Sequence, residues 1–401
     1  MNIPITKPVF DARDRESILE PLESGWVVQG PQVKRFETKF SQFSGAAFAL
    51  ATTSCTTALH LCMEGLKLGK GDRIIVPSFT FIATANAVEY TGAEVVFCDI
   101  KLDDFNIDPG LVESILEGDR ERRIKAVVPV HLFGLCANMD EIMRISAKHG
   151  LQVVEDAACG FDAWIGEKHA GTFGAAGCFS FHPRKAITTG EGGMVTTNDP
   201  GLARTISSLR DHGASTSDLQ RHLEKGGSLL PEYNVRGYNY RMTDFQGALG
   251  VTQLEKAATI MDARRKIAGK YNDALEEIEA LKPPSVPEGY THAYQSYVCL
   301  FTDGQDLAEL TFDRIDGLNR KRNKMMSELE RRGVATRQGT HAVHTLGYYR
   351  EKYGLSPGDC LSSYAADRLS ITLPLYAGMT ESEFDYVIAS IREVLGDTWE
   401  G

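Results

Sequence analysis

The sequence has no long apolar run and no closely spaced pair of cysteines. No window approaches the roughly 20 apolar residues that a membrane-spanning helix needs, and the opening MNIPITKPVFDARDRES lacks the basic-then-apolar order of a signal peptide. The 8 cysteines stand singly, without CxxC spacing, as is typical of reduced, buried thiols in a cytosolic protein. We therefore expect a cytoplasmic protein without a membrane segment and without a bound metal.

Positive charge is scarce as well. Lysine and arginine number 43 against 54 acidic residues, which gives a net charge of −11. This balance argues against general affinity for nucleic acids or membrane surfaces. It does not exclude an anionic substrate, because a local site can be positive inside an acidic protein. A length of 401 residues without internal repeats predicts two or three domains.

The first 200 residues alternate short apolar segments with stretches of helical periodicity. The predicted strands are 48–51, 73–76, 94–97, 126–130, 152–154, 178–181 and 193–196. The predicted helices are 11–24, 33–43, 58–66, 81–90, 109–116 and 139–149. This alternation predicts an α/β fold with a mostly parallel sheet covered on both faces. Functional groups collect at the carboxyl ends of such strands, where Ser54, Asp156 and residues 180–185 fall.

The pattern changes after residue 199. Residues 213–232 are polar and rich in Gly and Ser, which predicts a long loop. A helix is expected from Met242, with Thr243 as its N-cap, through Ala257 and on toward Glu276. We place a domain boundary near its middle, which gives a large domain 1–255 and a small α+β domain 256–401. The small domain is predicted to contain a strand 297–301, a helix 320–332, a loop 337–344 and a helix 381–395.

Lys185 stands in the stretch GCFSFHPRKAITTGEGGMVTT, between a buried strand and a Gly/Thr-rich loop. Lysine is normally a solvated surface residue. A partly desolvated lysine, or one near another cation such as Arg184, has a lowered pKa and becomes a nucleophile. Taken alone, a lysine that follows a strand is usually structural or solvated.

Asp156 ends the apolar segment LQVVEDAACG. Burying a carboxylate there is costly without a cationic partner, and a pyridinium nitrogen would be such a partner. The alternative is a solvent-facing aspartate that caps the next turn. The hydroxyl-rich turn 52–57, between a strand and a helix, is a common phosphate cradle, although such residues also cap helices for stability alone. Together with Lys185, these features favour pyridoxal 5′-phosphate (PLP) as cofactor.

Several longer motifs connect these residues. They are SGWVVQGPQVKRFE, TSCTTAL, PSFTFIATANAV, FCDI with FNIDP, PVHLFG, EDAA, SFHPRKAITTGEGGM and GYNYRMTDFQGALG. With them the chain resembles, over nearly its whole length, the DegT/DnrJ/EryC1/StrS family of PLP-dependent sugar aminotransferases. The resemblance implies the type I, aspartate aminotransferase-like fold and a homodimer with shared active sites.

The resemblance also implies roles for individual residues. Lys185 would be the Schiff-base lysine and Asp156 the partner of the pyridinium nitrogen. The phosphate would be held by Ser54, Cys55, Thr56 and Ser180, and from the neighbouring subunit by Asn239. Phe81 would stack on the pyridine ring. On the substrate side the resemblance places His344. Thr189 is a further candidate. Arg337, in the same loop as His344, either contacts an anionic substrate group or is an exposed arginine.

Two positions depart from the family pattern. Cys55 replaces the usual Gly of the phosphate turn, which is tolerable only if the backbone φ is negative there. Cys159 stands where the family commonly has Gln or His near the ring hydroxyl. It is either a quiet buried thiol or a site of altered substrate handling.

The expected activity is transfer of an amino group from L-glutamate to a keto-sugar, specifically a nucleotide-linked keto-deoxysugar. One alternative is a PLP-dependent sugar dehydratase, but dehydratases that resemble this family carry histidine in place of the lysine. A second alternative is a non-catalytic PLP-binding homologue. Such a protein would be expected to lose the lysine or the aspartate, and both Lys185 and Asp156 are present.

Overall fold

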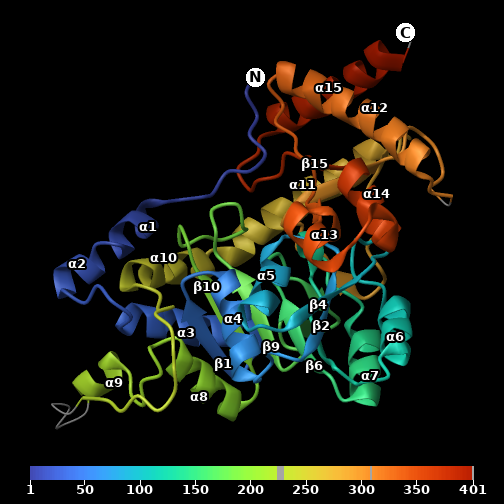
Figure 1. Cartoon of the computed structure of the whole chain (residues 1–401). Coiled ribbons are helices and arrows are strands. Elements are labelled where there is room, and N and C mark those ends of the chain that lie inside the picture. The colour runs from blue at the N-terminus through green and yellow to red at the C-terminus, as the bar shows by residue number, and fades with distance from the viewer. Residues whose placement is uncertain (224–229, 308, 400–401) are drawn as a thin grey trace.

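A computed structural model describes residues 1–223, 230–307 and 309–399. Its centre is a seven-stranded sheet of order β1-β10-β9-β6-β5-β2-β4 (Figure 1). The strands are β1 (Phe48–Thr52), β2 (Arg73–Pro77), β4 (Glu94–Cys98), β5 (Ile124–Val127), β6 (Gln152–Asp156), β9 (Ala176–Ser180) and β10 (Gly193–Thr197). Strand β10 is antiparallel to both of its neighbours, and the remaining pairs are parallel. The predicted mostly parallel α/β sheet is confirmed.

Alternation along the strands directs side chains to two cores. Ile74, Val154 and Cys178 pack in one cluster with helices α4 (Cys55–Gly65), α5 (Ala83–Tyr90) and α8 (Pro200–Leu209). Their neighbours Ile75, Val153 and Phe179 point to the other face. That face is covered by α3 (Pro31–Ser44), α10 (Asp244–Glu255), α6 (Pro109–Gly118) and α7 (Met139–His149). The sheet is therefore buried on both sides, as a parallel sheet requires.

The C-terminal part has its own antiparallel sheet, β11-β13-β15. Its elements are α11 (Ala257–Leu275), β11 (Leu281–Lys282), β13 (Tyr297–Phe301), α12 (Phe312–Arg331), α13 (Gly347–Tyr353), α14 (Leu361–Leu369), β15 (Ser370–Leu373) and α15 (Glu381–Trp399). The N-terminus lies beside this part (Figure 1), where Ile3 donates to the carbonyl of Gly333 at 2.8 Å. Ile3, Tyr271 and Tyr297 belong to one buried cluster, which also includes Phe79 and Phe133 from the first half of the chain.

The remaining α-helices and β-strands are short. They are α1 (Ala12–Ser17), α2 (Glu20–Ser24), β3 (Phe79–Thr80), β7 (Trp164–Ile165), β8 (Lys168–His169), α9 (Asp218–Leu223), β12 (Tyr290–Thr291) and β14 (His341–Ala342). Strand β14 pairs with β3. This pairing joins the loop that follows α12 to the edge of the large sheet, where the candidate site lies.

Several predicted elements differ from the structure. The helix expected over 11–24 is two helices, because Pro21 starts a new one. The helix expected from Met242 toward Glu276 breaks at Lys256, whose side chain is paired with Asp14 on α1. Helix α12 begins at Phe312, earlier than predicted, because Thr311 caps it. Strand β15 was not predicted. The predicted loop 213–232 contains α9, and its residues 224–229 lie outside the described residues.

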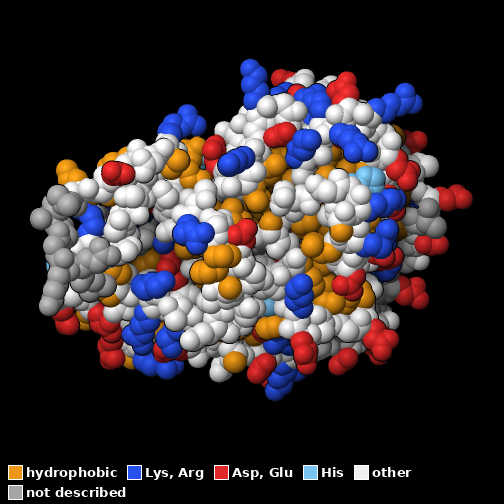
Figure 2. Space-filling model, turned by 90° about the horizontal axis from the view of Figure 1, so that it is seen from below, with side chains coloured by type: hydrophobic (Ala, Val, Ile, Leu, Met, Phe, Trp, Pro, Cys, Tyr) orange, Lys and Arg blue, Asp and Glu red, His pale blue; other side chains and the backbone are white. Residues whose placement is uncertain are grey.

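Acidic and basic side chains are interspersed on the face seen in Figure 2, with hydrophobic groups between them. No extended surface of one sign is visible there, in keeping with the mixed composition. Among the helices that the structure describes, none is both long enough and apolar enough to cross a membrane.

Candidate active site

A cavity of about 500 Å³ opens at the carboxyl ends of β6 and β9, where the loop 337–341 closes over the large sheet. Nine of the residues predicted for the site line it. They are Ser54, Cys55, Thr56, Phe81, Asp156, Cys159, Ser180, Lys185 and Arg337. Residues far apart in the sequence therefore meet around one space.

Three predicted residues lie elsewhere. Thr189 is buried and its hydroxyl donates to the carbonyl of Glu191 at 2.6 Å. His344 is fully buried, with its Nδ1 2.5 Å from the hydroxyl of Ser78, and the structure places His341 on the cavity wall instead. Asn239 is exposed on the surface of this chain and is not part of the cavity wall.

Asp156 is held at the end of β6 with 5% of its surface exposed. Its Oδ2 accepts a hydrogen bond from the hydroxyl of Thr84 at 2.7 Å, and its Oδ1 accepts one from the backbone N–H of Ala158 at 3.1 Å. Both donors are neutral. A nearly buried carboxylate with only neutral donors lacks a cationic partner, which a group that enters the cavity can supply.

Lys185 is half-buried on the loop that follows β9. Its backbone N–H donates to the carbonyl of His182 at 2.8 Å, which shapes the turn. Its Nζ lies 3.2 Å from Sγ of Cys159. The amine is thus directed into the cavity rather than into solvent, and Cys159 lies next to it.

The N-terminus of α4 forms the wall opposite the lysine loop. Ser54 and Thr57 form a capping box, in which the Ser54 hydroxyl accepts from the Thr57 N–H and the Thr57 hydroxyl accepts from the Ser54 N–H. A Cβ on Gly193 would lie 2.4 Å from the Ser54 carbonyl, so β10 passes this turn only with glycine there. The N–H groups of Cys55 and Thr56, the first two residues of the helix, remain available for an anion at the helix end.

Cys55 occupies the first turn of α4 without strain. Its φ is not among the positive values of the described residues, which confirms the condition set by the missing glycine. Its Sγ lies 3.4 Å from the carbonyl of Cys178 and 4.0 Å from Oδ1 of Asp156. Burial and the Asp156 charge raise the pKa of the Cys55 thiol well above its usual value, so it remains protonated.

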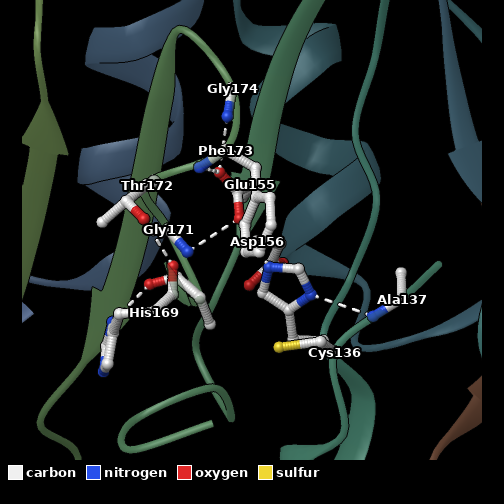
Figure 3. A network of polar contacts seen from close by, with 12 residues as sticks. Cys136, Ala137, Glu155, Asp156, His169, Gly171, Thr172, Phe173 and Gly174 are labelled. Carbon is white, nitrogen blue, oxygen red and sulfur yellow. Dashed lines mark hydrogen bonds and ion pairs between the residues drawn. The ribbon is translucent and has the colours of Figure 1, made fainter. Parts of the chain in front are cut away.

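Glu155, next to Asp156, is the centre of a separate buried network (Figure 3). Its Oε1 accepts from the N–H groups of Phe173 and Gly174, and its Oε2 from that of Gly171, each at 2.7 Å. His131 adds a fourth hydrogen bond at 2.8 Å. Because Nδ1 of His131 accepts from the Ala137 N–H at 3.1 Å, its Nε2 is the donor to Glu155.

The residues around the cavity have the chemistry that PLP requires. The helix end and Ser180 suit a phosphate, the carboxylate of Asp156 suits a protonated ring nitrogen, and Lys185 is the amine near both. Phe81, 64% exposed at the cavity, offers a flat apolar face. The residues present fit the cofactor, and the fold and cavity together define a PLP-dependent transferase of the aspartate aminotransferase-like type.

Comparison with known proteins gives the family. The chain belongs to the DegT/DnrJ/EryC1/StrS aminotransferase family, whose model matches residues 8–392. Members of this family are PLP-dependent sugar aminotransferases, and PLP is the cofactor of this enzyme.

Individual relatives match over their full length. The spore coat polysaccharide biosynthesis protein SpsC of Bacillus subtilis is 35% identical over 98% of this chain and 97% of its own. GDP-perosamine synthase of Caulobacter vibrioides is 33% identical over 98% of each chain. The structure of PseC of Helicobacter pylori, an aminotransferase involved in the biosynthesis of pseudoaminic acid, superposes with a TM-score of 0.87 at 26% identity. That superposition covers 99% of this chain and 100% of PseC.

Sequence reasoning missed several residues that shape the site. Thr84, the donor to Asp156, stands in the motif PSFTFIATANAV, and its position three residues after Phe81 on the next helix was the available signal. Gln295 and His341 line the cavity from segments that carry no motif. Only the tertiary fold brings these two to the site.

Proposed function

We propose that this enzyme transfers an amino group from L-glutamate to a nucleotide-linked keto-sugar, with Lys185 as the residue that attaches PLP and Asp156 as the partner of its ring nitrogen. The observation that supports this assignment is the shared cavity. The Nζ of Lys185 and the carboxylate of Asp156 meet there, beside the N-terminus of α4.

Each residue has a defined task in this proposal. PLP, when bound, supplies the electron sink for breaking the Cα–H bond of the donor. Asp156 holds the proton on the ring nitrogen. Lys185, as a free amine, moves a proton between the substrate Cα and the cofactor C4′. Ser180 and the first turn of α4 bind the phosphate, and Phe81 covers one face of the ring.

The names of the relatives support the sugar substrate. One relative is a GDP-perosamine synthase and another a spore coat polysaccharide biosynthesis protein. We propose from these names that the acceptor is linked to a nucleotide and that the product serves polysaccharide synthesis. The cavity of about 500 Å³ is of the usual size for a small-molecule site.

We also propose a homodimer in which Asn239 of one subunit reaches the phosphate in the other. Asn239 is exposed, and Nε of Arg241 donates to its side chain at 3.2 Å. Mixed dimers of Lys185→Ala and Asn239→Asp chains test this arrangement. Each inactive parent should regain activity on mixing, because one site of the hybrid then has both intact residues. Absence of any regain in verified hybrids would contradict shared sites.

The experiment that tests the central assignment follows the cofactor spectrum during addition of L-glutamate. We expect conversion to the pyridoxamine form in the wild type and in the control Lys125→Ala, whose lysine is exposed. Lys185→Ala should remain a folded protein and should not turn over. A wild-type spectrum that responds to no amino donor would refute the aminotransferase assignment, and substantial turnover by Lys185→Ala would refute the role of Lys185.

A further inference from the structure

One wall of the cavity carries two guanidinium groups. Arg184 directly precedes Lys185, and Arg337 lies between α12 and β14. Both line the main cavity, and both also line a small hollow beside it, together with Gln295 and Thr372. Segments from the two halves of the chain thus place two positive charges beside the reactive lysine.

Neither guanidinium has an acidic partner. Within residues 1–223, 230–307 and 309–399, no carboxylate lies within ion-pair distance of Arg184 or Arg337. Glu191 lines the same cavity but does not pair with either arginine. Nε of Arg337 is buried and forms no hydrogen bond with the described protein atoms. Other buried arginines among the described residues bind carboxylates or backbone carbonyls, as Arg210 binds Glu37 at 2.6 Å and Arg322 binds the carbonyl of Ser370 at 2.9 Å.

The hollow contains a second unsatisfied group. Thr372 is 2% exposed, and its Oγ1 is likewise buried without a hydrogen-bond partner among the described residues. Leaving a buried donor or acceptor unpaired costs about 1–3 kcal/mol. Thr372 lines only the hollow, which has a volume of about 10 Å³, whereas Arg337 also lines the main cavity, where its unpaired guanidinium faces space that a ligand can occupy.

The backbone behind both arginines is fixed. Arg337 exchanges hydrogen bonds with Thr372, at 2.7 and 3.4 Å. The carbonyl of Arg184 accepts from Nε2 of Gln295 at 3.0 Å, and the fully buried Arg264 donates to the carbonyl of Gln295 at 2.7 Å. The backbone of both arginines is therefore held in place. The side chain of Arg337 is half-buried, whereas that of Arg184 is exposed.

The two cations also oppose each other. Burial, and after it the positive charge of Arg184, lower the pKa of Arg337. An anion between the two groups would relieve both penalties, because it restores the charge balance that burial removes. The pair thus selects for negative charge at this position.

The position next to Lys185 indicates which anion. In an amino-acid donor, the α-carboxylate is bonded to the carbon that reacts, so it must lie close to the lysine amine. The phosphates of a nucleotide-linked sugar are separated from the reacting carbon by the sugar ring. A carboxylate also matches the planar fork of a guanidinium with two parallel hydrogen bonds.

We propose that Arg184 and Arg337 together bind the α-carboxylate of the amino donor. This inference rests on the proposed function, since it assigns a subsite for the first substrate of that reaction. It makes the pair specificity-determining: the site accepts amino acids and discriminates against amines that lack the carboxylate.

Calorimetry on the PLP-loaded enzyme tests the pair directly. The probe is 2-methyl-L-glutamate, which lacks the Cα hydrogen and so binds without being transaminated. We expect Arg337→Gln and Arg184→Gln each to weaken its binding roughly ten- to a hundredfold, while the control Arg204→Gln, an exposed arginine, binds as the wild type does. Binding of UDP and GDP should be unchanged in all variants.

The outcomes separate the alternatives. If the wild type binds the probe and both glutamine variants bind it equally well, the inference is wrong and the proposed function stands. If the loss falls on UDP or GDP instead, the pair is a diphosphate site and the inference is also wrong. A wild type that binds no amino acid overturns the donor assignment of the proposed function and this subsite with it. Should Arg337→Gln unfold, Arg337→Lys keeps the charge but not the fork and should show an intermediate loss.

Discussion

Glu155 and Asp156 are adjacent carboxylates on one strand, yet their surroundings differ completely. Glu155 is fully buried and accepts four hydrogen bonds, three of them from backbone N–H groups of the loop 171–174 (Figure 3). Asp156 accepts from Thr84 and Ala158 and keeps one side open to the cavity. Successive residues of a strand face opposite sides. One carboxylate therefore holds the scaffold together, and the other faces the cavity, where the proposed function gives it a chemical role.

Of the substitutions that follow from this comparison, one at Asp156 should have the largest effect, a loss of kcat. Asp156→Asn keeps the shape but cannot hold a proton on the ring nitrogen, so kcat should fall roughly 10²–10³-fold, or about 3–4 kcal/mol in the activation barrier. Single-turnover kinetics with L-glutamate measure this loss, and the exposed control Asp140→Asn should show none. Unfolding midpoints should change little. A variant that unfolds but retains full kcat per folded molecule would reverse the two roles.

The complementary effect is expected at Glu155. Glu155→Gln replaces one acceptor with an NH₂ group that faces N–H donors, so the free energy of unfolding should fall by about 3 kcal/mol. Urea titration followed by circular dichroism measures the loss. The control is Glu167→Gln, an exposed position. Activity per folded molecule should be close to wild type, and a selective loss of kcat at full stability would count against a scaffold role.

A smaller effect is expected at Thr84. Thr84→Val removes the hydroxyl that donates to Asp156 at 2.7 Å while keeping the side-chain shape. The less stabilised carboxylate should lower kcat/KM about tenfold. Thr84→Ser restores the donor and should restore most of the activity. If valine and serine variants are equally impaired, packing rather than the hydrogen bond would be the cause.

The smallest expected effect is the pH dependence of the stability, which arises from His169 on the Glu155 side of the strand. Burial lowers the pKa of His169 to about 4, whereas an unfolded histidine titrates near about 6.5. Because the unfolded state then binds the proton first, stability falls as the pH drops from about 6.5 toward 4, by about 1 kcal/mol between pH 7.5 and 5.5. Urea unfolding of the wild type and of His169→Gln at the two pH values checks this slope, which the variant should flatten. An exposed control, His222→Gln, should leave it unchanged.

The sequence was sufficient to predict those parts of the site that lie at the ends of strands. Strand ends are readable from apolar runs, and parallel strands place their ends together, so Asp156 and Lys185 could be assigned to one edge of the sheet. The role of Glu155 could not be predicted, because its partners belong to a loop that folds back from further along the chain. His344 was predicted because it occupies the position of the family histidine. The sequence does not show which way a side chain points, and in the structure His341 lines the cavity instead. The proposed role of Asn239 involves a second subunit, which the pattern of a single chain does not reveal.

The hydrogen bonds of the first residues have a consequence for biosynthesis. Ile3 pairs with Gly333 and packs in a cluster that includes Ile391, and Ile5 accepts from Leu375. During translation Gly333 and Leu375 emerge only after more than 300 further residues, so Ile3 and Ile5 stay without these contacts until the C-terminal part has been made. Contacts of such long sequence separation form slowly, and domains generally fold as the chain emerges. The central sheet can assemble before the C-terminal part emerges, whereas the contacts of Ile3 and Ile5 form only after it.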